Sequence, residues 1–481
     1  MSVIILNMTK ITTTNKTLAD VAQKYCRIIL TEDKPTWHRL VETTDGHLEY
    51  RMGAGKRKKA TLRSFRTLVR TIVQTSKAHQ LENIAIHLGA MGMPALEAMG
   101  TEWFFRTLGE NLELAQYEFN KYKTGKQAEG GLQEILVCGV SAPAEKQSFS
   151  AGLTIGQSAN LSRDIANTSG EDMTPSKLAA AAKEILHSTT ATIKILDTKA
   201  IKAEKMGLLE AVGKGAVDGP NLIVVEYWGA GKPTKTNKTE QPITLIGKGI
   251  TYDSGGLNVK PSGMHEMHMD MSGGATVIGA MRAIALLGIK KNVIALIPVA
   301  ENAISANSMR AGDIATSMSG KTVEILHTDA EGRMVLADAM TYADKYYSPR
   351  VMLDVATLTG ASLVALGQFT SVIMTKDDAL REQLVKLGEE TGDLMWPLPL
   401  WDEYKQSLKS YRADVANIAT NFSRFAGCIE GAAFLSYFAP KKTPWAHIDI
   451  APRMDSIPAD KLAKGATGEP VRLLVKFVEG Y

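Results

Sequence analysis

The sequence has 481 residues, of which 44% are hydrophobic and 22% are charged. This composition is typical of a globular protein and excludes wholesale disorder, a collagen-like fibre and a polytopic membrane protein. Lys and Arg number 55 against 51 Asp and Glu, and this surplus of +4 is too small to indicate a nucleic-acid partner.

Helices alternate with apolar strands in the first 150 residues. The stretch MSVIILNMTKITTT at 1–14 has no charged lead-in, and its apolar part is too short for a signal peptide, so it is interpreted as a first strand. Helical spacing predicts helices over 63–81 and about 112–122, and apolar runs predict strands from Glu82 and over 134–140. The alternation predicts a small α/β domain over 1–150. The basic run GKRKK at 55–59 is weighed as a phosphate contact, but a solvated loop is favoured.

A linker is expected next, followed by a larger domain. The small, polar stretch 141–150 precedes helical sequence, which predicts a linker helix over 151–170. Thr174 and Pro175 form an N-cap and N1 pair that opens a helix over 175–186. Further on, a helix is predicted over about 273–287, and strands are predicted near 193 and over 221–228, 242–249, 292–300 and 351–358. Continuously apolar strands separated by helices indicate a mainly parallel central sheet in a domain over 171–481.

Two features of the chain are interpreted as structurally ordinary. The hydrophilic segment 229–242 lacks the P-loop pattern and is expected to be a hairpin loop between two strands. Cys26, Cys138 and Cys428 lie far apart and form no CxxC pair, so neither a disulfide framework nor a thiolate zinc site is indicated. No run approaches the roughly 18 apolar residues of a membrane span. A cytoplasmic protein without a membrane partner is expected.

Acidic residues, lysines and glycines crowd into two segments, GKGITYDSGGLNVKPSGMHEMHMDMSGGA at 247–275 and HTDAEGRMVLADA at 327–339. In open α/β sheets, ligands bind at the carboxyl ends of strands, where such loops emerge. Asp329 and Glu331 are two residues apart, so an extended backbone would direct both carboxylates to one face, and the glycine that follows is expected to free the turn. Asp253 follows a strand, and Asp270 precedes a Gly-Gly pair expected to open a helix.

Four carboxylates at one site would repel each other unless cations neutralise them, and their hard oxygens suit Mn²⁺, Mg²⁺ or Zn²⁺. Two ions about 4 Å apart, which could hold a water and a substrate oxygen, are the natural solution. Any one of these acids alone is more often a cap or turn residue, and only their combination favours metal. Lys248 stays open between an ion pair and a neutral amine ligand. For Lys260 and Arg333, a salt bridge is as good an interpretation as stabilisation of an oxyanion.

Other catalytic patterns are poorly supported. His265 and His268 are three residues apart instead of the four of HExxH, and they are interpreted as ordinary polar residues. The sequence has no GxSxG elbow, so a Ser/His/Asp hydrolase is not indicated. The carboxylate cluster alone would also permit a dinuclear phosphoesterase.

The string TDAEGR at 328–333, together with GKGITYDSGGLNVKP and the downstream DMSGGA, resembles the leucyl aminopeptidases of peptidase family M17, the cytosol aminopeptidases. The resemblance runs from about Gly152 to Tyr481, and the N-terminal part is similar in size and α/β character, which implies a macro-like domain. It implies a dinuclear metal site in which Asp253 and Glu331 bridge the two ions. The implied ligands are Lys248, Asp253, Asp270, Asp329 and Glu331.

The same resemblance implies a reaction. Lys260 and Arg333 would be catalytic, and a bicarbonate ion held by Arg333 and the backbone near Leu358 would be the general base. The implied enzyme is a leucyl aminopeptidase that removes N-terminal Leu- or Met-like residues from peptides through a water activated by two metal ions, Mn²⁺ or Zn²⁺, with Mg²⁺ or Co²⁺ as alternatives. The implied pocket for the first side chain is apolar and weakly discriminating. It would be lined by Met267, Thr357, Gly360, Ala451 and Met454.

The sequence departs from the family pattern at two positions. His327 stands where Asn is usual, which puts the surroundings of the metal site in doubt, and Met334 replaces a common Leu. The family also implies a homohexamer that acts on peptide substrates. An alternative is a DNA-binding regulatory or scaffold member with weak or no peptidase activity, but the near-neutral charge argues against nucleic acid as a partner.

Overall fold

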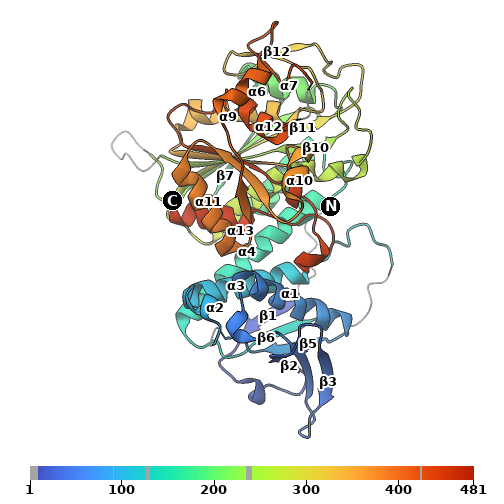
Figure 1. Cartoon of the computed structure of the whole chain (residues 1–481), viewed down its shortest axis with the longest axis vertical. Helices are drawn as coiled ribbons and strands as arrows, with labels where there is room; N and C mark the ends of the chain where they lie inside the picture. Colours follow the sequence, from blue (N-terminus) through green and yellow to red (C-terminus); the bar gives the residue numbers. More distant parts are fainter. Residues whose placement is uncertain (1–8, 90–91, 126–130, 234–240, 423–424) are drawn as a thin grey trace. The chain divides into compact units, whose positions relative to one another are not determined.

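The computed structural model describes residues 9–89, 92–125, 131–233, 241–422 and 425–481. The chain forms two compact α/β units, each with its own main sheet (Figure 1). The smaller unit comprises Met1–Asn160 and Ser456–Lys464, and the larger unit comprises Leu161–Asp455 and Gly465–Tyr481. Nothing in the sequence had indicated that 456–464 belongs with the smaller unit.

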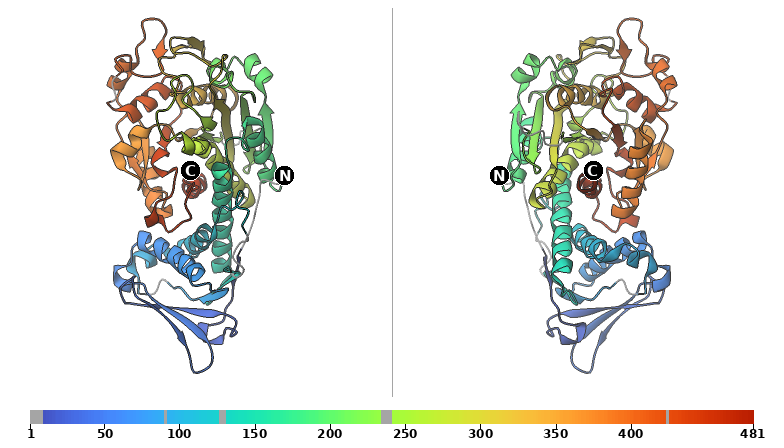
Figure 2. Two further views of the ribbon diagram at one scale, coloured as in Figure 1. Left: turned by 90° about the vertical axis from the view of Figure 1, so that its right-hand side faces the viewer. Right: turned by 90° about the vertical axis from the view of Figure 1, so that its left-hand side faces the viewer.

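The smaller unit contains a six-stranded sheet in the order β1-β6-β5-β2-β4-β3, in which only β3 is antiparallel to its neighbour. Helices lie over one face of this sheet (Figure 2). The apolar stripe of α1, which includes Phe65, Val69, Ile72 and Val73, is buried there. The strands are β1 (Lys10–Thr13), β2 (Cys26–Thr31), β3 (His38–Glu42), β4 (Leu48–Gly53), β5 (Asn83–Ile86) and β6 (Glu134–Val137); the helices are η1 (Leu18–Asp20), η2 (Arg57–Lys59), α1 (Leu62–Ala78), α2 (Pro94–Glu97) and α3 (Gly100–Gln116).

Four predictions concern elements of this smaller unit. The predicted strand from Glu82 is β5, and the expected first strand is β1, although residues 1–8 lie outside the described part of the chain. The helix predicted over 112–122 is wrong in extent, because α3 runs from Gly100 to Gln116 and buries Leu108 and Phe104 one and two turns before Leu112. The basic run at 55–59 includes η2, and its side chains from Lys56 to Lys59 are exposed, as expected for a solvated segment.

A long helix, α4 (Pro143–Asn167), runs through the segment expected to be a linker helix. The next helix, α5 (Pro175–Leu186), begins where the sequence predicts, with Thr174 at the N-cap position. The Thr174 side chain makes no capping hydrogen bond to this helix. Instead, the Asp218 carboxylate accepts the Ser176 N–H at 2.8 Å, so a residue distant in sequence satisfies the helix N-terminus.

The larger unit is built on a nine-stranded sheet in the order β16-β15-β18-β14-β9-β11-β8-β7, with β10 also paired to β11. The central strands β18, β14, β9, β11 and β10 run parallel, which confirms the predicted mainly parallel sheet. The strands are β7 (Thr192–Leu196), β8 (Asn221–Trp228), β9 (Ile243–Gly247), β10 (Gly249–Asp253), β11 (Asn292–Asn302), β14 (Val351–Ala356), β15 (Ser371–Thr375), β16 (Met395–Pro397) and β18 (Trp445–Asp449).

Helices cover both faces of this sheet, which explains why its central strands are apolar throughout. On one face α7, α9 and α12 supply Leu208, Met334 and Phe434 to the core, and α8 packs on β9 and β11 from the other. The remaining elements are α6 (Thr198–Ala203), α7 (Gly207–Gly213), η3 (Met264–Met271), α8 (Ser272–Leu286), α9 (Gly332–Tyr347), α10 (Gly360–Leu366), α11 (Asp378–Thr391), η4 (Asp402–Leu408), α12 (Gly427–Leu435), η5 (Ala451–Arg453), η6 (Pro458–Asp460) and α13 (Val471–Gly480), with a small sheet of β12 (Ile314–Thr316), β13 (Thr322–Glu324) and β17 (Val415–Ala416).

The expected hairpin at 229–242 is wrong. The strands on either side of this segment, β8 and β9, are not neighbours, because β11 lies between them and pairs antiparallel with β8 and parallel with β9. The segment therefore connects two strands across an intervening one, and its residues 234–240 lie outside the described part of the chain.

Among the described residues, no helix is both long and apolar enough to cross a membrane.

Candidate metal centre

The five residues expected as metal ligands come together at the carboxyl edge of the central sheet. Lys248 lies between β9 and β10, and Asp253 is the last residue of β10. Asp270 lies in the 3₁₀ helix η3, while Asp329 and Glu331 lie just before α9. Loops that leave parallel strands at one edge converge in space, which is why residues 83 positions apart in sequence can share a site.

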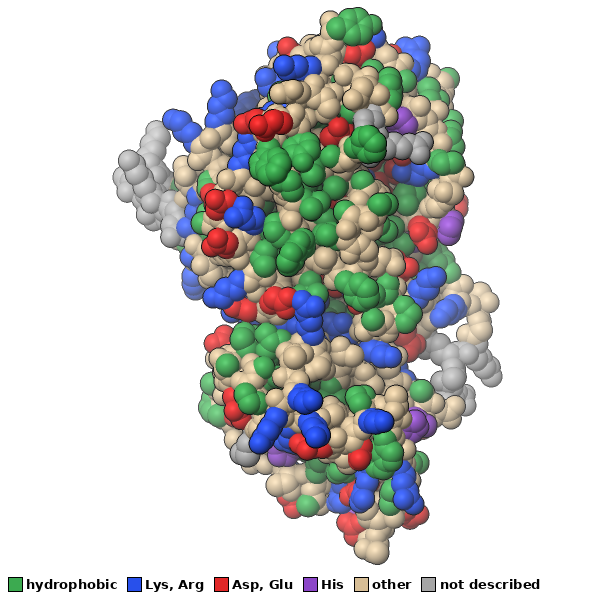
Figure 3. All heavy atoms as spheres, viewed as in Figure 1, with side chains coloured by type: hydrophobic (Ala, Val, Ile, Leu, Met, Phe, Trp, Pro, Cys, Tyr) green, Lys and Arg blue, Asp and Glu red, His purple; other side chains and the backbone are tan. Residues whose placement is uncertain are grey.

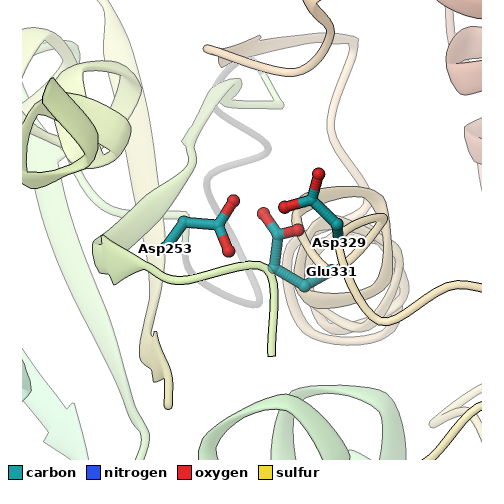
Figure 4. A group of neighbouring side chains, drawn as sticks. All are labelled: Asp253, Asp329 and Glu331. Atoms are coloured by element: carbon teal, nitrogen blue, oxygen red, sulfur yellow. The ribbon is translucent and has the colours of Figure 1, made fainter. Parts of the chain in front are cut away.

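Three carboxylates form the centre of this group. Asp253, Asp329 and Glu331 each offer an oxygen, and these oxygens all lie within 4.8 Å of one another (Figure 4). Two lysines flank them. The Lys248 Nζ lies 2.7 Å from Asp270 Oδ2 and 2.8 Å from Glu331 Oε1. The Lys260 Nζ lies 2.7 Å from Asp253 Oδ2 and 2.5 Å from Asp329 Oδ1.

The lysines neutralise only part of this negative charge. Burial, together with the negative charges of Asp253 and Glu331, raises the pKa of Asp270 to about 8 and that of Asp329 to about 7, although Lys248 and Lys260 lower the first and Lys260 lowers the second. Burial would also raise the pKa of Asp253, but Lys260 and Lys248 hold it below its ordinary value. Four carboxylates with two ammonium groups leave a deficit of positive charge that hard divalent cations would fill, so the residues present fit a metal centre.

The carboxylates around Lys248 favour its ammonium form. Burial lowers its pKa, but Asp270, Glu331 and Asp253 raise that pKa above its ordinary value by a larger amount. The ammonium group also donates to the Thr357 carbonyl oxygen at 3.1 Å. Lys248 would therefore have to lose a proton before its amine could bind a metal ion.

Two sequence interpretations of the Asp329–Arg333 segment are corrected by the backbone. The segment is not extended: Asp329 lies in a turn, and Glu331 has helical dihedrals of φ −78° and ψ −37°. The two carboxylates meet because the chain turns into α9. The second interpretation was that Gly332 frees the turn, but Gly332 is not among the glycines with positive φ. A Cβ atom there would lie 2.4 Å from Lys248 Cε, so this glycine makes room for the lysine.

In the Asp-Ser-Gly-Gly sequence, by contrast, the glycines do form the turn. Gly255 and Gly256 have φ of +86° and +63°. A Cβ atom on Gly255 would also lie 2.5 Å from the Asn258 carbonyl oxygen. The turn brings the chain back so that Lys260 reaches Asp253 and Asp329.

Several residues that orient these groups had not been singled out from the sequence. Asn302 Nδ2 donates to Asp253 Oδ1 at 2.8 Å and to the Thr328 carbonyl oxygen at 3.0 Å. Thr357, which had been expected only in the substrate pocket, donates its hydroxyl to Asp270 Oδ1 at 2.6 Å. These partners come from different elements, so no spacing in the sequence could have indicated them.

Arg333 and Leu358, the residues expected to hold bicarbonate, lie beside each other. A Cβ atom built on Gly431 would be 3.0 Å from Leu358 Cδ2 and 3.5 Å from Arg333 Nη2. Arg333 Nη1 donates to the Asn417 carbonyl oxygen at 2.8 Å, and its buried Nε has no hydrogen-bond partner among the described residues. A buried guanidinium with an unused donor fits an anion. The Leu358 N–H donates to Asp449 Oδ1 at 3.0 Å.

The expected substrate-pocket residues lie around the same edge. Met267 belongs to η3, Thr357 bonds Asp270 of that helix, and Gly360 is the first residue of α10, which packs against η5. Ala451 begins η5, and Met454 follows it directly. A Cβ atom on Gly360 would meet no atom within 4 Å, so there is open space at this point. Asp449, which sequence reasoning missed, joins these segments by accepting the N–H groups of Leu358 and Ala451.

The two departures from the family pattern lie next to the carboxylate centre. His327 is half-buried, and its Nδ1 accepts the Asp329 N–H at 3.3 Å. Burial, together with the positive charges of Lys260 and Arg333, lowers the pKa of His327. The imidazole is therefore neutral at physiological pH, which its acceptor role requires. Met334 is fully buried in the core of the larger unit.

A mainly parallel sheet with four carboxylates and two lysines at its carboxyl edge defines an α/β protein with a centre of the kind that binds divalent metal ions. The family model for the cytosol aminopeptidase catalytic domain matches residues 160–475, and the model for the N-terminal domain of the same family matches residues 51–126. The chain belongs to the cytosol aminopeptidase family, peptidase family M17.

Relatives and solved structures agree with this assignment. The chain is 42% identical over 382 residues to probable cytosol aminopeptidases of Burkholderia mallei strain SAVP1 and Burkholderia pseudomallei strain K96243, covering 79% of this chain and 73% of each relative. The bottromycin maturation enzyme BotP in complex with Mn has the same fold, with a TM-score of 0.83 and 28% identity over 98% of this chain and 99% of BotP. A second BotP structure gives a TM-score of 0.82 at 27% identity, with the same coverage.

Proposed function

We propose that this protein is a metal-dependent aminopeptidase of the leucyl aminopeptidase type, which removes N-terminal residues, Leu- or Met-like with broad tolerance, from peptides. The observation that carries the proposal is the group of four carboxylates at the sheet edge, with Lys260 and Arg333 beside it, in a member of the cytosol aminopeptidase family. We assign this chemistry to the larger unit, Leu161–Asp455 and Gly465–Tyr481, which includes most of the domain expected over 171–481.

The proposed cofactors are two divalent ions, Mn²⁺ or Zn²⁺, held by Lys248, Asp253, Asp270, Asp329 and Glu331. That a BotP structure contains Mn favours Mn²⁺ as the first ion to test. When bound, such ions would polarise the scissile carbonyl and make a water molecule a stronger nucleophile. Asp253, Asp329 and Glu331 would hold the ions through their neighbouring oxygens, and Lys248, which contacts both Glu331 and Asp270, connects these two carboxylates.

The chain's own groups then have distinct roles. The Lys260 ammonium, at the solvent side of the cluster, would stabilise the negative charge that develops on the substrate carbonyl oxygen. The carboxylate of Asp270, held by Thr357, would accept hydrogen bonds from the free α-amine of the substrate. This need for a free amine makes the enzyme an exopeptidase. Met267, Thr357, Gly360, Ala451 and Met454 would surround the first side chain.

Arg333 would hold a bicarbonate ion with its unused Nε, beside the backbone of Leu358. A bicarbonate bound there would accept the proton of the attacking water. Two further donors lie on the same side, the Leu358 N–H and the Thr359 hydroxyl, and both are engaged by Asp449. Asp449 would thus keep this edge of the anion site in place.

Hydrolysis of Leu-p-nitroanilide by Mn²⁺-loaded protein tests the proposal. We expect turnover with Mn²⁺ that is lost on metal removal, and a fall in kcat/KM of at least about 10³-fold in Glu331→Gln, which keeps the shape of the side chain but removes its charge. The same variant should bind less Mn²⁺ by elemental analysis. An absence of turnover on a panel of aminoacyl substrates with every metal tested would contradict the proposal.

Assembly and location are proposed from the family and from surface composition. A homohexamer is supported by large apolar side chains that are exposed on the larger unit, including Val364 at 90%, Phe369 at 65% and Tyr411 at 93%. Figure 3 shows hydrophobic side chains gathered on the face of the larger unit toward the viewer. Such surfaces usually mark protein contacts. Light scattering should give six times the chain mass.

A cytoplasmic location is supported by three buried, unpaired cysteine thiols.

A further inference from the structure

Asn417, which is fully buried and directly follows β17, uses all of its polar groups in hydrogen bonds to one region of the larger unit. Its backbone N–H donates to the Glu324 carbonyl oxygen at 3.0 Å, which continues the parallel pairing of β17 with β13 by one residue. The chain after β13 leads within a few residues to Asp329 and Glu331. Asn417 therefore stands where the small three-stranded sheet ends and the loop of the metal centre begins.

Beyond the end of β17, the Asn417 side chain makes hydrogen bonds to the backbone that follows β13. Its Oδ1 accepts the N–H groups of Leu326 at 2.8 Å and His327 at 3.3 Å, and its Nδ2 donates to the His327 carbonyl oxygen at 2.7 Å. The carboxamide acts as a substitute peptide group. Only a side chain with an acceptor on one side and a donor on the other makes all three bonds, so Asp, Ser or Leu would lose at least one.

The backbone of Asn417 holds the other end of the same loop. Its carbonyl oxygen accepts from Arg333 Nη1 at 2.8 Å. One residue thus binds Leu326 and His327 where the loop begins and Arg333 where it passes into α9. Asp329 and Glu331 lie between these two points. A displacement of Asn417 would move both carboxylates and the guanidinium together.

We propose that Asn417 is a positioning residue that sets the geometry of the metal-ligand loop and of the Arg333 anion site. This inference rests on the proposed function, since Asn417 is not among the proposed metal-holding or substrate-pocket residues and would act through residues 326–333. A purely structural asparagine would lower stability when replaced, without a specific effect on metal affinity. The two roles are therefore separable by experiment.

Asn292 provides a matched control. It is also a buried asparagine whose carboxamide uses both its donor and its acceptor in hydrogen bonds to the backbone. Its Nδ2 donates to the Gly231 carbonyl oxygen at 3.0 Å, and its Oδ1 accepts the Ala230 N–H at 3.1 Å. It lies at the first residue of β11, whereas the metal centre lies at the carboxyl ends of the parallel strands. Replacing it removes similar bonds at the opposite end of the sheet.

The experiment compares Asn417→Ala and Asn417→Asp with Asn292→Ala in the full chain. Mn²⁺ affinity is measured by calorimetry, kcat and KM with Leu-p-nitroanilide, and stability by chemical unfolding. We expect Asn417→Ala to weaken Mn²⁺ binding about 10- to 100-fold and to lower kcat by a similar factor, with KM changed less than about threefold. Asn417→Asp keeps the side-chain volume, but it places an acceptor against the His327 carbonyl oxygen and adds a buried negative charge, so it should show losses at least as large.

Asn292→Ala should destabilise the protein comparably but leave Mn²⁺ affinity and kcat within about threefold of the wild type. The proposal is overturned if the Asn417 variants keep Mn²⁺ affinity within threefold, or if Asn292→Ala loses as much. Asn417→Asp carries the test should Asn417→Ala fail to fold. A wild-type protein without peptidase activity would contradict the proposed function alone, because the difference in Mn²⁺ affinity still decides the role of Asn417.

Discussion

The two lysines of the metal centre have the same chemistry but different surroundings. The Lys248 side chain is 3% exposed and contacts Asp270 and Glu331, both equally buried, whereas Lys260 is 17% exposed and contacts Asp329, which is 27% exposed. The backbone of Lys248 is held within the sheet, because its N–H donates to the Val355 carbonyl oxygen at 2.9 Å. The inner lysine is therefore positioned by backbone pairing with β14.

The outer half depends on side chains that tie loops together. Thr328 Oγ1 donates to the Gly255 carbonyl oxygen at 2.6 Å and accepts the Asn258 N–H at 2.8 Å, so the loop of Asp329 is fastened to the loop of Lys260. The comparison teaches that burial and backbone pairing fix the inner lysine, while a few polar side chains join the loops that carry Lys260 and Asp329. The inner lysine should therefore matter more for stability than the outer one.

The largest expected effect tests this contrast directly. Lys260→Ala should lower kcat about 10²- to 10³-fold, because a preorganised charge near the reacting oxygen is lost, while stability changes by only about 1 kcal/mol. Lys248→Ala should lower the unfolding free energy of the metal-free protein by about 3 kcal/mol, because buried carboxylates lose their counter-charge. Chemical unfolding and steady-state kinetics on both variants measure the two quantities. Equal stability losses would show that the two halves do not differ.

A smaller effect is expected when the inner lysine is only displaced. In Gly332→Ala the new Cβ atom would lie 2.4 Å from Lys248 Cε, so the lysine has to shift away from Asp270 and Glu331. We expect kcat/KM to fall about 10- to 100-fold, as for other changes next to a metal site. Gly480→Ala is the control, since a Cβ atom there meets no atom within 4 Å. A Gly332→Ala enzyme as active as this control would mean that the crowding is relieved without cost.

The smallest effect concerns pH. In the metal-free protein the pKa values of Asp270, about 8, and Asp329, about 7, lie above the unfolded value of about 4, so the folded chain keeps protons that the unfolded chain has lost. These two groups should therefore make the unfolding free energy fall as pH rises from about 4 to about 8.

Mn²⁺ would replace those protons, so the increase in Tm on adding Mn²⁺ should grow from pH 6 to pH 8. Thermal unfolding at pH 6, 7 and 8, with and without Mn²⁺, measures this increase. The same increase at all three values would argue against protonated carboxylates at the site.

Much of the fold of the larger unit followed from local patterns. Buried parallel strands such as β9 and β11 are continuously apolar, and the predicted helix over about 273–287 is α8, because these patterns depend on neighbours in sequence. The pairing of strands was less accessible. The expected hairpin at 229–242 failed because β11, which is placed between β8 and β9, lies some 50 residues later in the chain.

By itself, the sequence determined the family and which residues crowd into the two acidic segments, because residue types and short spacings are local properties. Only the tertiary structure decided that Gly332 makes room for Lys248, that Asn302 orients Asp253, and that Asn417 bonds both ends of the loop. These contacts join elements 49 to 91 residues apart. Hydrogen bonds over such separations exist only once the sheet has brought its carboxyl ends together, and no local pattern records them.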